Sequence, residues 1–129
     1  MKIESKPFDA INPLHYRQHD VECITFARGL PYSLGCAFKY VWRYKDKSTS
    51  KENLEKALWY INDAMDYADS IASKDYLETL SLPDTLDDFQ KRVLSDIIML
   101  AWYTNPETRT EAYSIIRDEI TRELKKYTR

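Results

Sequence analysis

The helical spacing of apolar residues is the feature that most constrains the fold of this chain. In one segment they recur every three or four positions, at Leu54, Ala57, Leu58, Ile61, Ala64, Met65, Ala68 and Ile71. Such a stripe buries one side of an α-helix. Strict alternation, which marks β-strands, is rare, and only two of the 129 residues are glycine. We therefore predict an all-α fold.

The length of the chain fits a single compact domain, residues 1–129, with about five helices. An irregular N-terminal arm is expected over residues 1–18, because Pro7 and Pro13 interrupt helical segments there. Helices are then predicted at 21–28, at 33–44, along the stripe described above, from Leu86 to about Thr104, and after Asn105-Pro106.

Helix ends are predicted from capping residues. Asp20 can cap the first helix, and Gly29 would follow its C-terminus, with Pro31 preventing continuation. The pattern T-x-x-E at Thr49 and Glu52 predicts a capping box at the start of the third helix.

The charge balance limits the classes of partner. The chain carries 19 Lys and Arg against 21 Asp and Glu, a net charge of −2, so bulk charge does not favour nucleic acid. Any anion site must be local. No window of the sequence reads as a targeting segment or a membrane span, so we expect no membrane partner and a cytoplasmic location. Cys23 and Cys36 are predicted to be reduced thiols.

The segment SLGCAFKYVWRYKDK, residues 33–47, carries the most suggestive pattern. On a helical wheel its apolar side chains form one arc, at Leu34, Ala37, Phe38, Val41 and Trp42. The opposite arc holds Cys36, Lys39, Tyr40 and Arg43. Two cations one turn apart can clamp a phosphate while the phenol stacks or donates a hydrogen bond. The alternative is that both cations are solvated, with their stems covering apolar surface.

Other chemistries find less support in the sequence. The two glycines do not form a P-loop or a dinucleotide-binding motif, and no cofactor is predicted. His15, His19 and Cys23 are spaced by four, but their helical register is not secured, so we predict no metal site. The acidic residues Asp63, Asp66 and Asp69 are interpreted as a solvated edge.

The order of four sequence blocks resembles the bacteriophage family known as domain of unknown function 3310. The blocks are NPLHY at 12–16, VECI at 21–24, GCAFKYVWR at 35–43 and ENLEKALWYI at 52–61. The resemblance covers residues 12–62, and residues 63–129 carry no recognised signature. That family includes a small phage nucleotide kinase that lacks a P-loop.

The resemblance implies which residues carry a site. It places polar catalytic partners at His15, Glu22 and Glu52, and ligand-binding residues at Tyr16, Lys39, Tyr40, Arg43, Lys56 and Tyr60. Three family positions that commonly hold an Asp or Asn are here Thr25, Cys36 and Asn53. If the missing carboxylates held a metal or acted as a base, this chain would bind a ligand without turning it over.

Two hypotheses of function follow from these observations. The first is a phage or prophage accessory protein with a nucleotide or phosphate site, resembling the kinase-like members and catalytically degenerate; if active, it would be a nucleoside monophosphate kinase. The alternative is a non-enzymatic effector that inhibits a host protein such as a nuclease or a CRISPR defence complex, since ten tyrosines offer interface anchors. Nucleic-acid binding is a third, weaker reading. We also expect homo-oligomers, because Trp59 and Trp102 are predicted to be exposed.

Overall fold

The computed structural model describes residues 22–45, 49–66 and 74–128, and these residues form helices without any strand. The α-helices are α2 (Cys23–Ala27), α3 (Tyr32–Trp42), α4 (Ser50–Asp66), α5 (Lys74–Leu77), α6 (Asp88–Met99) and α7 (Pro106–Leu124). Two 3₁₀ turns, η2 (Leu100–Trp102) and η3 (Lys125–Tyr127), extend α6 and α7. The all-α prediction is confirmed. The predicted helices correspond to α2, α3, α4, α6 and α7.

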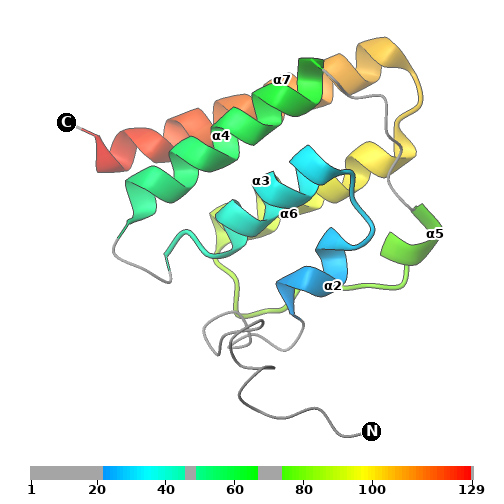
Figure 1. Cartoon of the computed structure of the whole chain (residues 1–129), viewed down its shortest axis with the longest axis horizontal. Coiled ribbons are helices and arrows are strands. Elements are labelled where there is room, and N and C mark those ends of the chain that lie inside the picture. Colours follow the sequence, from blue (N-terminus) through cyan, green and yellow to red (C-terminus); the bar gives the residue numbers. More distant parts are fainter. Residues whose placement is uncertain (1–21, 46–48, 67–73, 129) are drawn as a thin grey trace, which may run out of the picture.

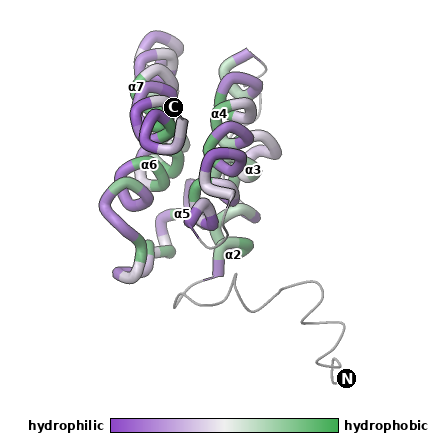
Figure 2. The backbone as a smooth tube through the Cα atoms, turned by 90° about the vertical axis from the view of Figure 1, so that its left-hand side faces the viewer, coloured by the Kyte–Doolittle hydropathy of each residue, from purple (hydrophilic) through white to green (hydrophobic). Residues whose placement is uncertain are grey.

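The helices form two layers. One layer contains α3 and α4, and the other contains α6 and α7 (Figure 2). The long helices α4 and α7 lie side by side, although they are distant in sequence (Figure 1). Because α3 packs against α2, α4 and α6, it is the central element of the fold. No described helix has the length and apolarity needed to span a membrane.

The core follows the predicted apolar arcs. All five apolar residues of the α3 arc are buried, as are Leu54, Ala57, Ile61 and Ala64 of the α4 stripe. Phe26 of α2 packs on Phe38 and Trp42, with ring centroids 5.3 and 5.8 Å away. These three rings are fully buried, so α2 is fixed to α3 mainly by aromatic packing.

Several helix ends differ from the predicted positions. The first helix is shorter than 21–28, and Glu22, predicted inside its first turn, occupies the N-cap position without a side-chain capping bond. The predicted cap Asp20 lies outside the described residues. The second helix ends at Trp42 rather than at residue 44, and the fourth ends at Met99, with η2 completing the predicted range almost to Thr104. The predicted Asn105 cap with Pro106 at the first helical position is confirmed.

Gly29 follows α2, as predicted, and it also has a packing role. No described glycine has a positive φ, so Gly29 does not act as a left-handed cap. A Cβ at this position would lie 2.7 Å from Cδ2 of Tyr76 and 2.9 Å from Cδ2 of Leu77. Glycine therefore allows the close approach of α5, a short helix that no apolar periodicity predicts.

A buried glutamine joins α3 to α6. The Nε2 of Gln90 donates to the backbone oxygens of Val41 and Trp42, 3.2 and 2.7 Å away. Its Oε1 accepts from the backbone N–H of Asp87, whose carboxylate caps Gln90 in return. This capping box satisfies both the N-terminus of α6 and the carbonyls at the C-terminus of α3, which fixes the last turn of α3.

Candidate anion-binding face on α3 and α4

The helices α3 and α4 run antiparallel and share one partly exposed face. We call it the α3–α4 face, and it consists of Tyr32, Ser33, Cys36, Lys39, Tyr40, Arg43, Lys56, Trp59, Tyr60 and Asp63. Two contacts between the helices show that they run in opposite directions. Ser33 near the start of α3 contacts Asp63 near the end of α4, whereas Tyr40 lies beside Lys56.

Three cations converge on one phenol ring of this face. The Nζ of Lys39 lies 4.7 Å from the centroid of Tyr40, the Nζ of Lys56 5.5 Å, and the Cζ of Arg43 5.7 Å. All three distances fall within the range of a cation–π interaction. We call Lys39, Arg43 and Lys56 the cationic cluster. It brings together a pair predicted on one helix with a third cation from the next helix.

The two lysines of the cluster lack acidic partners in the part of the chain that the structure describes. No ion pair there involves Lys39 or Lys56. Glu52 lies one turn before Lys56, but this exposed carboxylate does not pair with it among the described residues. Like charges held close together repel, and no described carboxylate bonded to the two lysines offsets that repulsion. The local excess of positive charge favours an anion at this position.

A buried amide lies on the same side of α4 as the cluster. Asn53 is 3% exposed, and its Nδ2 has no hydrogen-bond partner among the described residues. It precedes Lys56 by three residues and Tyr60 by seven, so the three share a helix face. An unsatisfied buried donor costs free energy, and a ligand oxygen could accept from it.

Aromatic rings continue the face beyond the cluster. Tyr40 stacks on Tyr60 with centroids 6.0 Å apart and planes at 10°. Tyr32 and Trp59 each meet Tyr60 edge to face, at 6.3 and 5.1 Å. Trp59 is 61% exposed, as predicted, whereas Trp102, also predicted to be exposed, is half-buried in η2.

Tyr32 on this face and the buried Cys23 of α2 beneath the cations both stay neutral near pH 7. The pKa of Tyr32 is raised by the neighbouring thiol of Cys36 and by the phenol of Tyr60. Burial raises the pKa of Cys23 to about 12, although the charges of Lys39 and Arg43 oppose this shift. Neither group therefore places a negative charge against an incoming anion. Both cysteines are free thiols, as predicted.

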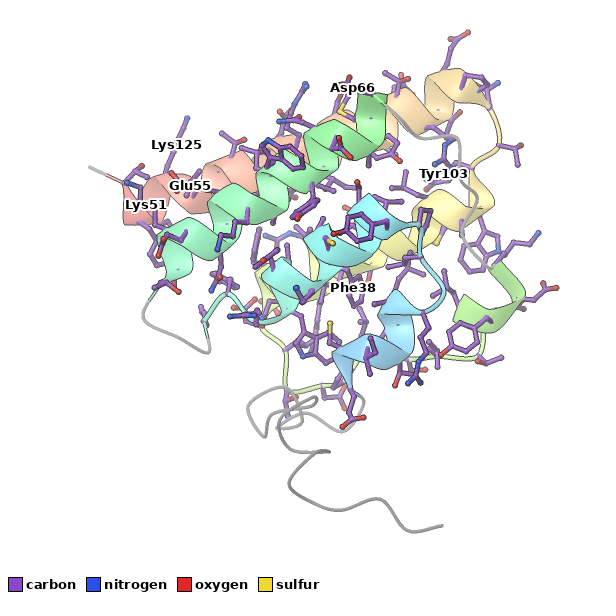
Figure 3. The ribbon with its side chains drawn as sticks, viewed as in Figure 1. Phe38, Lys51, Glu55, Asp66, Tyr103 and Lys125 are labelled. Carbon is purple, nitrogen blue, oxygen red and sulfur yellow. The ribbon has the colours of Figure 1, made fainter. Side chains whose placement is uncertain are left out.

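The predicted acidic edge is only partly correct. Asp66 is exposed at the end of α4 (Figure 3), and Asp69 lies outside the described residues. Asp63, however, is half-buried and accepts a hydrogen bond from the Ser33 hydroxyl at 2.5 Å. Its role depends on the pairing of α3 with α4, so spacing within α4 alone could not reveal it.

The predicted catalytic residues Glu22 and Glu52 lie at the starts of two different helices. Glu52 is exposed in the first turn of α4, and Glu22 is half-buried before α2. His15 and Tyr16 lie outside the described residues. So does His19, which is spaced by four from His15 and Cys23. Among the described residues, no three side chains of the metal-binding types come together.

Comparison with known families agrees with the four sequence blocks. Residues 11–62 match the sequence model of a family described as a protein of unknown function, DUF3310. This segment is therefore similar to the DUF3310 family. The match covers less than half of the chain, but it contains α2, α3 and the part of α4 that carries Lys56, and thus the whole cationic cluster. No curated protein and no solved structure matches the chain.

Proposed function

We propose that the α3–α4 face binds a phosphate-bearing ligand of the nucleotide type. The observation that carries this proposal is the convergence of Lys39, Lys56 and Arg43 on the ring of Tyr40, with both lysines lacking a described acidic partner. An arginine can hold two phosphate oxygens with its planar fork, and each lysine supplies a point charge. The partly exposed aromatic rings beside the cluster suit a ligand with a flat base.

The proposed biological setting is a phage or prophage accessory protein related to kinase-like members of its family. In phosphoryl transfer, cations neutralise the charge of the transferred group, which accounts for much of the catalysis by protein. Glu52 is exposed, and none of the described residues orients it as a base toward the cluster. This arrangement supports binding more strongly than turnover, so we propose a catalytically degenerate member.

Calorimetry on the full chain tests the proposal directly. Pyrophosphate, tripolyphosphate and deoxynucleoside mono- and triphosphates would be titrated into the wild type and into Lys39→Ala and Lys56→Ala. We expect binding that weakens roughly tenfold in each variant, since a charge-assisted contact is worth about 1.5–3 kcal/mol. Lys74→Ala removes an exposed lysine of α5, at the far side of the molecule from the start of α4 (Figure 1), and should bind like the wild type. If no phosphate compound binds, or if all three variants behave alike, the proposal is wrong.

A second candidate function is a non-enzymatic effector that binds a host protein. The observation that favours it is the exposure of two large aromatic side chains, Tyr32 at 78% and Trp59 at 61%. Tyrosine and tryptophan are typical anchors of protein interfaces. This function predicts a saturable complex with one purified host protein, lost in Trp59→Ala, together with no nucleotide turnover. The same surface could serve self-association, which sedimentation of the wild type and Trp59→Ala would measure.

A further inference from the structure

The two ends of the α3–α4 face differ in their chemistry. At one end, Ser33 and Asp63 form a hydrogen-bonded pair. The edge-to-face contact of Tyr32 with Tyr60 follows, and then the stacked contact of Tyr60 with Tyr40. The cationic cluster surrounds Tyr40 at the other end. The order along the face is thus carboxylate, aromatic rings and cations.

The length of this arrangement fits one kind of small molecule. Ser33 and Tyr40 are seven residues apart on α3, which corresponds to about 10 Å at the rise of an α-helix. This is the scale of a nucleotide measured from its α-phosphate to the outer edge of its base. A bare phosphate or pyrophosphate would occupy only the cationic end.

Charge fixes the orientation of such a ligand. Phosphate oxygens are attracted by the cationic cluster and repelled by the carboxylate of Asp63. The far end of the ligand must therefore bring hydrogen-bond donors to Asp63. Its Oδ2 accepts from Ser33, and no described side chain donates to its Oδ1. A base N–H or a sugar O–H could fill that position.

The middle of the face offers a stacking surface. The Tyr32 ring is 78% exposed and is held by its edge-to-face contact with Tyr60. An exposed, positioned aromatic ring accepts any base on its flat side, and such stacking is tolerant of sequence. Trp59 contacts Tyr60 as well and is 61% exposed. Its own exposed ring adds to the aromatic surface around Tyr60.

We propose that a nucleotide binds along the α3–α4 face with its phosphates on the cationic cluster, its base on Tyr32 and a base or sugar donor on Asp63. This inference rests on the proposed function and adds its orientation and two new residues, Tyr32 and Asp63. Asp63 is assigned as a specificity-determining residue, because it selects for donors at the end of the ligand opposite the phosphates.

The test compares deoxynucleoside triphosphates with tripolyphosphate, which carries similar charge but lacks a nucleoside. On the wild type, we expect the nucleotides to bind about tenfold more tightly than tripolyphosphate. Tyr32→Ala should remove this difference without changing the affinity for tripolyphosphate, and Tyr32→Phe, which keeps the ring, should restore it. Ile115→Ala, which trims an exposed apolar side chain on α7, serves as the matched control and should change neither affinity.

Asp63→Asn provides a second test, because it should change the affinities for nucleotides and for tripolyphosphate in different ways. It should weaken nucleotide binding while leaving tripolyphosphate binding equal or slightly tighter, because a repelling charge is removed. If its effect differs among the four bases, the donor is on the base; if it differs between ribose and deoxyribose compounds, the donor is on the sugar. Equal effects of Tyr32→Ala and Asp63→Asn on nucleotides and tripolyphosphate would overturn the orientation, as would affinity that rises with oligonucleotide length. Failure of the wild type to bind either compound would overturn the proposed function itself.

Discussion

The hydroxyl of Tyr44 lies 3.0 Å from Oε2 of Glu123, which joins the end of α3 to the end of α7 inside the protein. It also lies 3.1 Å from Oδ2 of Asp87 at the start of α6. Tyr44 is fully buried, and its pKa is raised by burial and by the two carboxylates. The phenol therefore stays protonated, and its single proton is shared between two acceptors that Lys45 and Lys126 also contact.

Removal of this hydroxyl should destabilise the protein. In Tyr44→Phe the ring packing is kept, but two partly buried carboxylates lose a donor. We expect the free energy of unfolding in urea to fall by about 2 kcal/mol, the scale of a hydrogen bond to a charged group. Tyr103→Phe is the matched control, because no described residue bonds its hydroxyl, and it should be close to neutral. Equal stability of Tyr44→Phe and the wild type would mean that the network contributes nothing.

Asp87 should make the free energy of unfolding depend on pH in the acidic range. Burial raises the pKa of its carboxyl, but the backbone N–H of Gln90 and the ammonium of Lys45 outweigh burial and hold the pKa below its usual value. A lowered pKa in the folded state means that the charged form stabilises the fold. This contribution is complete above the ordinary Asp value, about pH 4, and is lost as the pH falls through the lower folded value.

Asp87→Asn isolates this charge, because Asn is an equally good helix cap. We expect the variant to be less stable than the wild type at pH 7 and the difference to shrink steadily as the pH falls from 5 to about 2. Urea unfolding at each pH measures it. A difference that stays constant with pH would assign the loss to the cap or to packing.

The two thiols should react at very different rates. With a pKa of about 12, Cys23 is almost entirely protonated at pH 8, with about one thiolate in ten thousand. It is also buried, whereas Cys36 is half-buried on the α3–α4 face. A disulfide reagent should therefore label Cys36 in the folded protein and Cys23 only on unfolding. Cys36→Ser should abolish the fast phase, and Cys23→Ser should keep it; the reverse assignment would contradict the burial of α2.

Local sequence signals predicted the single helices well and their associations poorly. The arc of Leu34, Phe38 and Trp42 and the cap at Asn105 follow from spacing and residue type within one segment, and the structure confirms both. Helix α5 has only four residues, and its position depends on packing against Gly29. No periodic pattern could reveal such a helix. The capping box of Asp87 and Gln90 matches the pattern D-x-x-Q before an apolar run, so this helix start is predictable from local sequence.

The candidate site, too, could be predicted from the sequence only in part. The pair Lys39 and Arg43 could be placed on one helix face from spacing alone, but its meeting with Lys56 requires the antiparallel pairing of α3 and α4. That pairing is a tertiary contact, so only the family resemblance could group these residues beforehand. Tyr32 and Asp63 were not grouped by either route. Their contacts with Tyr60 and Ser33 cross between helices.

A substitution of Asn53 should affect the stability of the fold and the binding of an anion in different ways. Its buried Nδ2 has no described partner, so the amide costs stability in the absence of ligand. Asn53→Leu should leave the melting temperature equal or raise it in ligand-free protein, because an apolar side chain of similar size replaces an unsatisfied donor. The increase in melting temperature caused by tripolyphosphate should become smaller, because one donor to the anion is lost.

The matched control is Asn62→Leu, which changes an exposed amide of the same helix and should leave the tripolyphosphate effect intact. Thermal unfolding of the wild type and both variants, with and without tripolyphosphate, gives the four comparisons needed. A lower melting temperature of Asn53→Leu with an unchanged response to tripolyphosphate would show that the amide serves the fold alone. General destabilisation cannot produce the expected result. It would lower the melting temperature of the ligand-free protein, whereas Asn53→Leu should leave that temperature equal or raise it.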